Sequence, residues 1–404
     1  MSNASALGAI EYEVESAWGE NVSTFATHRL PVLDKVDVTG LKHDKVAPAR
    51  VIQYRNDGTQ HIVGAQDGSE IKLKMWLTGH GSATSGATTV DAIETFLGLL
   101  VGNVAVSSAT GTTSSAGTAA APTTAAVSGF AAGSLCRVGV IGDGRGNGQF
   151  YPIATHATST LTLLAALDAA PSGSDVVHSA VMLHPSENPT TGTVASFRLR
   201  TLSANLGYEL HGCFIKALSL TGFNTGEIPA IEVTIGVSWW QYAGGTFPSV
   251  VTQNAYSPAP VAAGSFFLNT VGTSTRAKRT HRSLSIDWTL GVVPLSGPGG
   301  ANQYQTIVGA RRTPDSIKLS WTEDAAAGND ALWTGTSRYH ACITLNAVSG
   351  SAVGFYMPNL CITGARPMQM DDGGINRQKI EAMAYTGPTT TSDLTLSAIR
   401  MAFA

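Results

Sequence analysis

Apolar and polar residues alternate along several short segments of the chain, which is the pattern of a strand with one buried face. The clearest examples are IKLKMWL at 71–77, IEVTIGV at 231–237 and LSIDWTL at 284–290. Most of the remaining chain also consists of short apolar segments bounded by turn residues. We therefore predict a mainly β protein built from many short strands.

One segment has helical periodicity instead. Thr88 and Asp91 are separated by the spacing of a capping box, and Gly102 follows the segment as a stop signal. Between them, four apolar residues fall on one helical face: Val90, Ile93, Leu97 and Leu100. We predict a single amphipathic helix that ends before Gly102.

The composition changes abruptly after this helix. Residues 104–126 are almost entirely Ala, Ser, Thr and Gly, which is the composition of a flexible linker. Turn residues at 188–192 (NPTTG) close the segment that follows. Between the two lie strand patterns of their own, at 135–140, 149–154, 161–164 and 176–183. This order predicts a small β domain inserted into a loop of a larger one.

An internal repeat relates the two ends of the chain. IVGA at 62–65 followed by IKL at 71–73 recurs as IVGA at 307–310 followed by IKL at 317–319. A second match follows in the same order, pairing 207–208, 213–215 and 226–228 with 354–355, 361–362 and 374–375. The offset between the copies falls by about 100 residues between the two matches, close to the size of the linker plus insertion. Duplication with one insertion explains both matches, and chance similarity of β-rich segments is the alternative.

These features divide the chain into two related domains and an insertion. The first domain comprises residues 1–103 and 190–250, and the second comprises 251–404. The linker and the small inserted β domain occupy 104–189.

The composition favours a protein that hides its surface against copies of itself. Only 13% of residues are charged, the net charge is −3, and small residues are abundant. This balance gives no electrostatic footprint for nucleic-acid binding. The first residues lack the pattern of a signal peptide, and no apolar run has membrane-spanning length, so we expect a soluble product made inside the cell. We expect buried free thiols in a reducing compartment, because no CxxC spacing links Cys136, Cys213, Cys342 and Cys361.

The glycine-rich stretch VIGDGRGNGQFYPI at 140–153 resembles a phosphate-binding loop only superficially. No Lys-Ser or Lys-Thr follows the glycines, as a P-loop requires, and Asn147 stands where a dinucleotide loop needs its third glycine. Pro152 argues against the helix that would bind the phosphate, and Asp143 alone cannot form a calcium-binding repeat. We predict a hairpin loop.

The other candidate sites have structural interpretations that we favour. His178 and His184 lack metal-ligand spacing, and Asp371-Asp372 fits a solvated turn. The basic cluster 276–282 (RAKRTHR) fits a surface loop or contacts with a neighbouring subunit better than contacts with DNA phosphates, and Trp239-Trp240 fits core or interface packing. No nucleophile elbow is present. We predict no catalytic, cofactor or metal site and no enzymatic activity.

Several segments together resemble one known family. They are ESAWG at 15–19, the segment 64–78, FLGLLVG at 96–102, GCFIKALSL at 212–220 within 196–242, FYMPN at 355–359, GGI at 373–375 and SDLTLS at 392–397. Together they resemble the major tail tube proteins of long-tailed double-stranded DNA bacteriophages. SGFAAG at 128–133 and the segment 169–175 resemble insertions of that family. The resemblance covers most of the chain, but it consists of strand and glycine patterns without a chemical signature.

The resemblance implies a fold and an assembly. Each domain would be a β-sandwich or half-barrel of two packed sheets with at most one flanking helix. Neighbouring subunits would join their inner strands into a ring, and stacked rings would form the tail tube, through which DNA passes during ejection. The inner wall would be acidic, with Glu209, Glu227 and Glu232 as candidates by strand position.

The resemblance also implies partners and a location. The partners would be further copies of the chain, the tape measure, the tail terminator and the distal tail or baseplate proteins. Double-stranded DNA would pass through the lumen without sequence-specific binding, and no membrane would be involved. The protein would be made in the host cytoplasm and would reside in the tail of the virion.

Duplication implies a specific ring. The usual ring of six single-domain subunits would be closed by three two-domain chains, giving pseudo-sixfold symmetry, with the insertion on the outer wall. A polar arm at 36–59 and the Pro- and Gly-rich segment 294–304 would contact the stacked rings.

Two other functions stay open from the sequence. A tail terminator, baseplate or head decoration protein shares the same small β-rich folds. A carbohydrate-binding module belongs to another class and would need aromatic side chains gathered on a groove. The tryptophans are instead scattered along the chain: Trp18, Trp76, Trp239, Trp240, Trp288, Trp321 and Trp333.

Overall fold

The fold is described from a computed structural model. It covers residues 9–20, 29–30, 38–41, 45–46, 62–63, 69–79, 92–106, 112–124, 130–139, 143, 146–172, 175–185, 194–203, 206–243, 261, 264–274, 276–297, 305, 307–324, 332, 336–347, 350–365, 369–370, 376–387 and 393–404.

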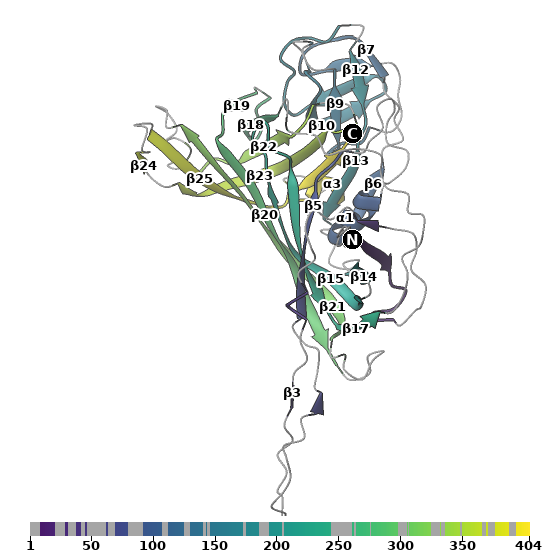
Figure 1. Ribbon diagram of the computed structural model, residues 1–404. Helices are drawn as coiled ribbons and strands as arrows, with labels where there is room; N and C mark the ends of the chain where they lie inside the picture. Colours follow the sequence, from purple (N-terminus) through teal and green to yellow (C-terminus); the bar gives the residue numbers. More distant parts are fainter. Residues whose placement is uncertain are drawn as a thin grey trace, which may run out of the picture.

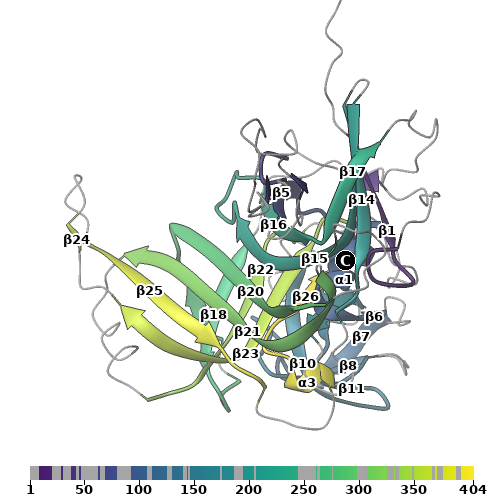
Figure 2. The same ribbon diagram turned by 90° about the horizontal axis from the view of Figure 1, so that it is seen from below.

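The protein is mainly β, with large antiparallel sheets, one of which curls into a half-barrel. One continuous 18-stranded sheet folds back on itself, and a small closed barrel lies beside it. Figures 1 and 2 show the curled sheet from two sides, with the small barrel near the C-terminus. The three segments with the clearest alternation are all strands. They form β5 (Ser69–Trp76), β16 (Ala230–Val237) and β20 (Ser283–Ser296).

The first half of the main sheet is built around β5, β16 and one helix. Its other strands are β1 (Ala9–Val14), β2 (Arg29–Leu30), β14 (Phe197–Ser203), β15 (Leu206–Thr221) and β17 (Trp239–Ala243). The predicted helix is α1 (Ala92–Val101), which ends directly before Gly102. Its capping residues Thr88 and Asp91 lie outside the described residues. Phe96 of α1 packs against Tyr12 and Phe197 at ring distances of 5.3 and 5.5 Å, which fixes the helix on this half.

The second half begins near residue 261 and contains β20 together with eight other strands and a short helix. These elements are β18 (Ser265–Thr270), β19 (Lys278–Arg279), β21 (Ile307–Asp324), β22 (Tyr339–Thr344), β23 (Val353–Ala365), β24 (Gln369–Met370), β25 (Asn376–Ala384), α3 (Asp393–Leu396) and β26 (Arg400–Phe403).

The two halves repeat one pattern of strand pairing. In the first half the antiparallel pairs are β1–β2, β1–β14, β14–β15, β15–β16, β15–β17 and β16–β5. In the second half the pairs β18–β19, β18–β22, β22–β23, β23–β25, β23–β26 and β25–β21 follow in the same order. The internal repeat of the sequence is therefore matched by the strand topology.

The pairing corrects one detail of the sequence repeat. Lys72 and Lys318 occupy matching positions, and their partners across the sheet are Thr234 and Met383. On their other side, Thr234 of β16 lies opposite Ala217 and Met383 of β25 lies opposite Cys361. The strand pairing therefore matches Cys361 with Ala217, whereas the sequence repeat matches it with Cys213. Both strands carry a register shift near this point, and such β-bulges move an alignment along a strand.

The small barrel is inserted between two paired strands of the main sheet. The chain leaves through β6 (Gly102–Val106) and returns through β13 (Val181–Pro185), with Val106 opposite Val181. β13 also pairs with β26 of the second half. The barrel itself consists of β7 (Thr112–Gly117), β8 (Pro122–Thr124), β9 (Leu135–Val138), β10 (Gln149–Ala157), β11 (Thr160–Leu163) and β12 (Val176–His178).

The expectation of a flexible linker at 104–126 is wrong for its described residues. That segment forms part of β6 and the strands β7 and β8, which close the barrel by pairing with β12 and β11. The Thr-rich composition is compatible with strands because a branched Cβ fits a pleated sheet. The strands that pair with β7 and β8 lie far along the chain, so the local sequence does not reveal this pairing.

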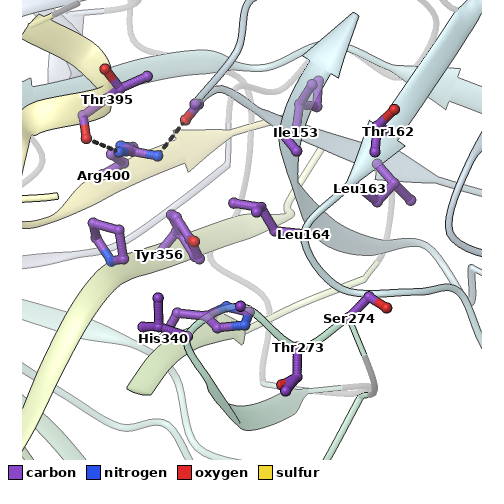
Figure 3. A pocket seen from close by; sticks show the side chains of 15 residues that line it. Ile153, Thr162, Leu163, Leu164, Thr273, Ser274, His340, Tyr356, Thr395 and Arg400 are labelled. Atoms are coloured by element: carbon purple, nitrogen blue, oxygen red, sulfur yellow. Dashed lines mark hydrogen bonds between the residues drawn. The ribbon is translucent and has the colours of Figure 1, made fainter. Parts of the chain in front are cut away.

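A packed seam docks the barrel on the second half. Phe150 of β10 lies against Gly354 of β23, where an added Cβ atom would come within 2.5 Å of the Phe150 ring. The Phe150 amide donates a hydrogen bond to the hydroxyl of Thr344 at 3.1 Å. The buried cluster across the seam includes Leu135, Phe150, Ala165, Phe267, Cys342 and Tyr356. Burial of these side chains gives the barrel one fixed position, and Figure 3 shows part of the seam.

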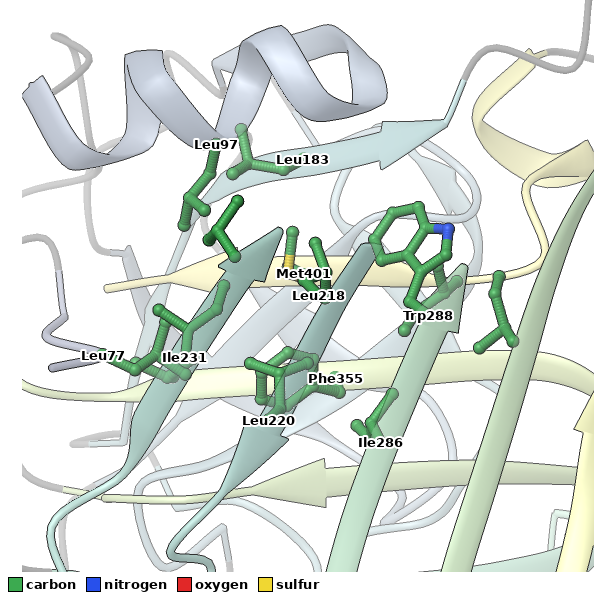
Figure 4. Packing of buried hydrophobic residues seen from close by; sticks show 14 of the residues in the cluster. Leu77, Leu97, Leu183, Leu218, Leu220, Ile231, Ile286, Trp288, Phe355 and Met401 are labelled. Carbon is green, nitrogen blue, oxygen red and sulfur yellow. The ribbon is translucent and has the colours of Figure 1, made fainter. Parts of the chain in front are cut away.

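The main core lies between the curled sheet and the strands that cover it. Figure 4 shows Leu218, Leu220, Ile231 and Ile286 of the curled sheet facing Phe355 and Met401 of β23 and β26, with Leu97 of α1 and Leu183 of β13 closing one end. All of these side chains belong to one buried cluster. Side chains from both halves share this core, so the two repeats form one packed unit.

Candidate assembly interface

Seven strands form a continuous run across the two halves, in the order β5, β16, β15, β20, β21, β25 and the end of β23. One face of this run packs on the main core. The side chains of the opposite face, which we call the polar face, include Lys72, Ser219, Glu232, Asp287, Lys318 and Glu381. Alternation along each strand separates the two faces, as the exposure of β5 shows residue by residue.

Several charges of the polar face are joined in ion pairs. Lys72 lies 3.1 Å from Glu232, and Lys318 lies 2.8 Å from Glu381. Lys379 also contacts Glu381, at 3.0 Å. The hydrogen bonds from Lys318 and Lys379 lower the pKa of Glu381 to about 2. The acidic wall that the family resemblance implies is therefore not a property of this face.

Two of these ion pairs occupy matching positions in the two repeats. Lys72 and Lys318 occupy the same position in the two repeats. Glu232 lies opposite Lys74 in β5, and Glu381 lies opposite Ser320, the residue of β21 that matches Lys74. Lys72–Glu232 and Lys318–Glu381 are thus the same diagonal contact in two copies. The repeat extends from topology to individual side chains.

The three glutamates expected on an inner wall do not share one face. Glu232 lies on the polar face. Glu209 lies on the first part of β15, where its carboxylate accepts a hydrogen bond from Gln241 at 2.9 Å. Glu227 lies in the turn before β16 and is bound to the side chain of Asn224 at 3.0 Å. The structure therefore brings only Glu232 onto the polar face.

The two repeats are joined in the middle of the seven-strand run. β20 of the second half pairs with the last part of β15 in the first half, with Ala217 opposite Thr289 and Leu220 opposite Ile286. At the matching position of the second half, residues 361–365 of β23 pair with β25 on one side. Among the described strands, none pairs with the other side of 361–365, which we call the open edge.

A short segment of the first half occupies the place that corresponds to β20. Gly40 lies beside β5, so close that an added Cβ atom would come within 2.0 Å of the carbonyl oxygen of Glu70. Leu41 packs against the main core, and Thr39 is exposed. In the second half, Thr289 of β20 lies opposite Ser316, which matches Glu70 in the repeat. Segment 38–41 is a turn, in which the Leu41 amide donates to the Val38 carbonyl at 3.0 Å, and it lies beside β5 at the position where β20 lies beside β21.

The three arginines of the basic cluster 276–282 make contacts within the chain. Arg276 pairs with Asp168 of the barrel region at 2.7 Å, donates to the Tyr151 hydroxyl at 2.8 Å and also binds the side chain of Gln149. Its guanidinium lies 4.8 Å from the centre of the Phe267 ring. Arg276 therefore joins the barrel region to the second half of the same chain, and not to a neighbouring subunit as one expectation had it.

The other two arginines of this cluster pair with the end of β21. Arg279 lies 3.7 Å from Glu323, whose pKa is raised by burial. Arg282 binds Asp324 through two hydrogen bonds of 2.8 and 3.3 Å. These pairs hold β19 and the start of β20 against β21 and do not form a phosphate-binding surface.

The glycine-rich stretch is the connection between two paired strands, as predicted. β9 and β10 are antiparallel, with Val138 opposite Gln149. The Asp143 carboxylate accepts a hydrogen bond from the amide of Asn147 at 2.8 Å, and Asn147 and Gly148 both have positive φ. Such a conformation explains the need for Asn and Gly in this hairpin.

The remaining candidate residues are structural where they are described. His184 is buried, and its Nδ1 lies 3.0 Å from the Ser397 hydroxyl. Trp239 is fully buried, stacks on His211 at 3.9 Å and donates to the carbonyl of Gly19, which confirms its packing role. Burial lowers the pKa of both His178 and His211 to about 4. Asp371 and Asp372 lie outside the described residues.

Metal and membrane sites were sought in the same part of the chain. Within the described ranges, His, Cys, Asp and Glu side chains form no group of three or more that could hold a metal ion. Across those ranges, neither helix has the length and hydrophobicity needed to cross a bilayer.

The two segments expected to contact stacked rings are hairpins. The strands β3 (Lys45–Val46) and β4 (Ile62–Val63) pair with each other, and β3 lies well away from the body in Figure 1. The counterpart in the second half is the end of the β20–β21 hairpin, where Val293 and Leu295 are exposed. Apart from 38–41 and 45–46, the residues of 36–59 lie outside the described parts, as do residues 298–304.

Comparisons with known proteins give weak likenesses. No family model and no curated protein matches the sequence. A chain from a cryo-EM structure of the anti-feeding prophage baseplate aligns with 14% identity and a TM-score of 0.26, over 31% of this chain and 91% of that one. A chain from the anti-feeding prophage tube-terminating cap aligns with 13% identity and a TM-score of 0.27, over 39% of this chain and 100% of that one.

Sequence reasoning missed the residues of the open edge and of segment 38–41. An edge strand is defined by what does not pair with it, and this depends on the arrangement of distant strands. Cys361 is visible in the sequence as a thiol and as part of the repeat, but not as a residue of an edge. The sequence repeat offers one route to segment 38–41. In the second copy β20 precedes the IKL motif at 317–319, so its counterpart in the first copy is expected upstream of Lys72.

Proposed function

We propose that the protein is a structural component of a phage-like tail, whose chains join into rings that stack into a tube for DNA. The observation that carries this proposal is the junction between the repeats. β20 completes β15 within the chain, and the matching position on β23 is the open edge. In the proposed ring, segment 38–41 of another copy takes the place of β20 at this edge.

The proposed contact has a defined register. Ala217 lies opposite Thr289 inside the chain, and Cys361 matches Ala217. Gly40 lies beside Glu70, and at the matching place in the second half Thr289 lies beside Ser316. Gly40 therefore occupies the position of Thr289. In the proposed contact, Cys361 of one copy would then face residues 39–40 of the next. Three chains joined in this way would give six equivalent junctions, three inside chains and three between them.

The polar face is the proposed lining of the tube. Lys72, Lys318 and Lys379 are paired with carboxylates, which leaves few cations to hold phosphates, and DNA would slide past without sequence-specific binding. The β3–β4 hairpin and the β20–β21 hairpin would contact the next ring. A tape measure, a terminator and a distal tail or baseplate protein would be the other partners, all within the tail of a virion.

A disulfide experiment tests the proposed junction. Thr39→Cys places a thiol on the exposed residue beside Gly40, facing Cys361 of the next copy. Under mild oxidation we expect covalent oligomers that end at a closed ring, and the further change Cys361→Ser should abolish them. Thr118→Cys, in an exposed turn of the barrel, is the matched control and should give no ladder. Monomeric Thr39→Cys chains after oxidation of assembled protein would refute the junction.

A further inference from the structure

A pocket of about 390 Å³ opens at the seam between the small barrel and the second half. Figure 3 shows Arg400, Tyr356 and His340 along one side of it, and Ile153, Leu163 and Leu164 of the barrel along the other. Thr273 and Ser274 lie at its lower rim in this view. The walls are mainly apolar, and Arg400 is the charged side chain among the residues that line the pocket.

Arg400 is a buried cation with hydrogen bonds to neutral groups. It is 2% exposed, and it donates to the carbonyls of Gly133 at 2.8 Å and Thr395 at 2.9 Å. Its Nε atom has no hydrogen-bond partner among the described residues, and no described carboxylate pairs with the guanidinium. Desolvation lowers the pKa of Arg400 to about 10, so the side chain stays charged at neutral pH. A buried charge without a counter-ion costs free energy that an anion would offset.

His340 lies on the same wall; burial lowers its pKa, and its ring has a hydrogen bond with the backbone of Thr273. It is 4% exposed, and its Nδ1 atom has no partner within the described residues. Tyr356 lies between the two side chains, with its ring 5.2 Å from the Arg400 guanidinium and 6.0 Å from the His340 ring. The wall thus presents a cation next to a flat aromatic ring. A carboxylate attached to an apolar body matches this arrangement, because the body can pack on Leu163, Leu164 and Tyr356.

We propose that this pocket binds a carboxylate carried on a compact apolar body, with Arg400 as its counter-ion. The group could belong to a free organic acid or to an acidic side chain of a second copy, since both offer the same chemistry. Neither the open edge nor segment 38–41 lines the pocket. The inference therefore stands independently of the proposed ring.

The test uses 2-naphthoate as the probe and 2-naphthamide, its neutral analogue, as the control. Titration calorimetry on the full chain should show saturable binding of naphthoate and at least about tenfold weaker binding of naphthamide, because the charged hydrogen bond is lost. Absence of naphthoate binding at millimolar concentration would overturn the proposal. Equal affinity for the two probes would overturn it as well.

Two alanines of β10 supply matched variants. Ala154 lines the pocket, whereas Ala157 is exposed on the same strand and does not line it. Ala154→Trp should fill the pocket and abolish naphthoate binding, while Ala157→Trp should leave it unchanged. Naphthoate binding that survives Ala154→Trp would refute the location. Arg400→Met, checked for folding by circular dichroism, should remove the preference for naphthoate over naphthamide.

Comparing dispersed and assembled protein separates the two sources of the carboxylate. If a second copy supplies it, naphthoate should bind dispersed chains at least about tenfold more tightly than assembled ones. If a free organic acid is the natural ligand, the affinity should be the same in both forms. Either result requires a carboxylate-selective pocket.

Discussion

At the scale of single residues, Arg276 contributes more to the stability of the fold than Arg282 of the same basic cluster. Arg276 is inserted between the barrel and β18, with hydrogen bonds to Asp168, Tyr151 and Gln149. Arg282 makes a solvent-exposed pair with Asp324. Burial decides the difference, because exposed ion pairs contribute little to stability.

The matched substitutions Arg276→Met and Arg282→Met test this contrast. Arg276→Met should lower the free energy of unfolding by about 3 kcal/mol, since it removes charged hydrogen bonds in a buried seam. Arg282→Met should have a much smaller effect. Urea unfolding of both variants measures the difference. Equal stabilities of the two variants would contradict the role given to Arg276.

The four cysteines differ in reactivity in a way that the fold dictates. Burial raises the pKa of Cys136 to about 12 and raises the pKa values of Cys213 and Cys342 as well, so their thiolates are scarce at neutral pH. Cys361 is only half-buried. In dispersed native protein, a disulfide-exchange reagent at pH 8 should titrate one thiol rapidly, and four after denaturation. Rapid reaction of more than one native thiol would contradict the described core.

At this scale the sequence carried little information about contacts. The charge of Arg276 is visible in the sequence, but its partner Asp168 is 108 positions away. The glycines of the 140–153 stretch were interpretable, because positive φ at a hairpin selects Gly and Asn locally.

At the scale of elements, the insertion breaks the symmetry of the two repeats. Glu11 of β1 lies opposite Arg200 of β14 and pairs with it at 2.6 Å. The matching position in the second half holds Phe267 opposite Cys342, two apolar side chains under the barrel. The face that is charged in the first repeat is apolar in the second because the barrel covers it.

Removing the barrel should therefore expose an apolar surface. A chain in which residues 107–180 are replaced by Asn-Gly keeps the β6–β13 pair, whose ends Val106 and Val181 are adjacent. We expect it to aggregate and to bind a hydrophobic dye, because Phe267, Tyr356 and Ala402 lose their cover. Light scattering and dye fluorescence measure this. A soluble, cooperatively unfolding chain without dye binding would contradict the docked position of the barrel.

Elements were the level that the sequence predicted best. Strands such as β5 and β16 show alternation because one face is buried and the other is solvated. The sequence predicts a linker where β7 and β8 lie, because the small residues of these strands show no hydrophobic periodicity. The strands that pair with β7 and β8 are β12 and β11, which are distant in the sequence. The long register of β20 with β21 likewise follows from tertiary pairing.

At the scale of the whole molecule, two repeats share one core and one seven-strand run. The sequence repeat indicated this duplication, and the six matching strand pairs and the matched ion pairs agree with it. What the sequence did not indicate is that the junction between the repeats would also define a way of joining chains. That requires knowing which side of β23 carries no described neighbour.

The proposed ring is the central claim, and counting chains in the assembled ring tests it most directly. Native mass spectrometry and end-on electron micrographs of the purified full chain should show closed rings of three chains, with six similar lobes around a lumen. Rings of six full chains, or a protein that stays monomeric under conditions that assemble tails, would contradict the account.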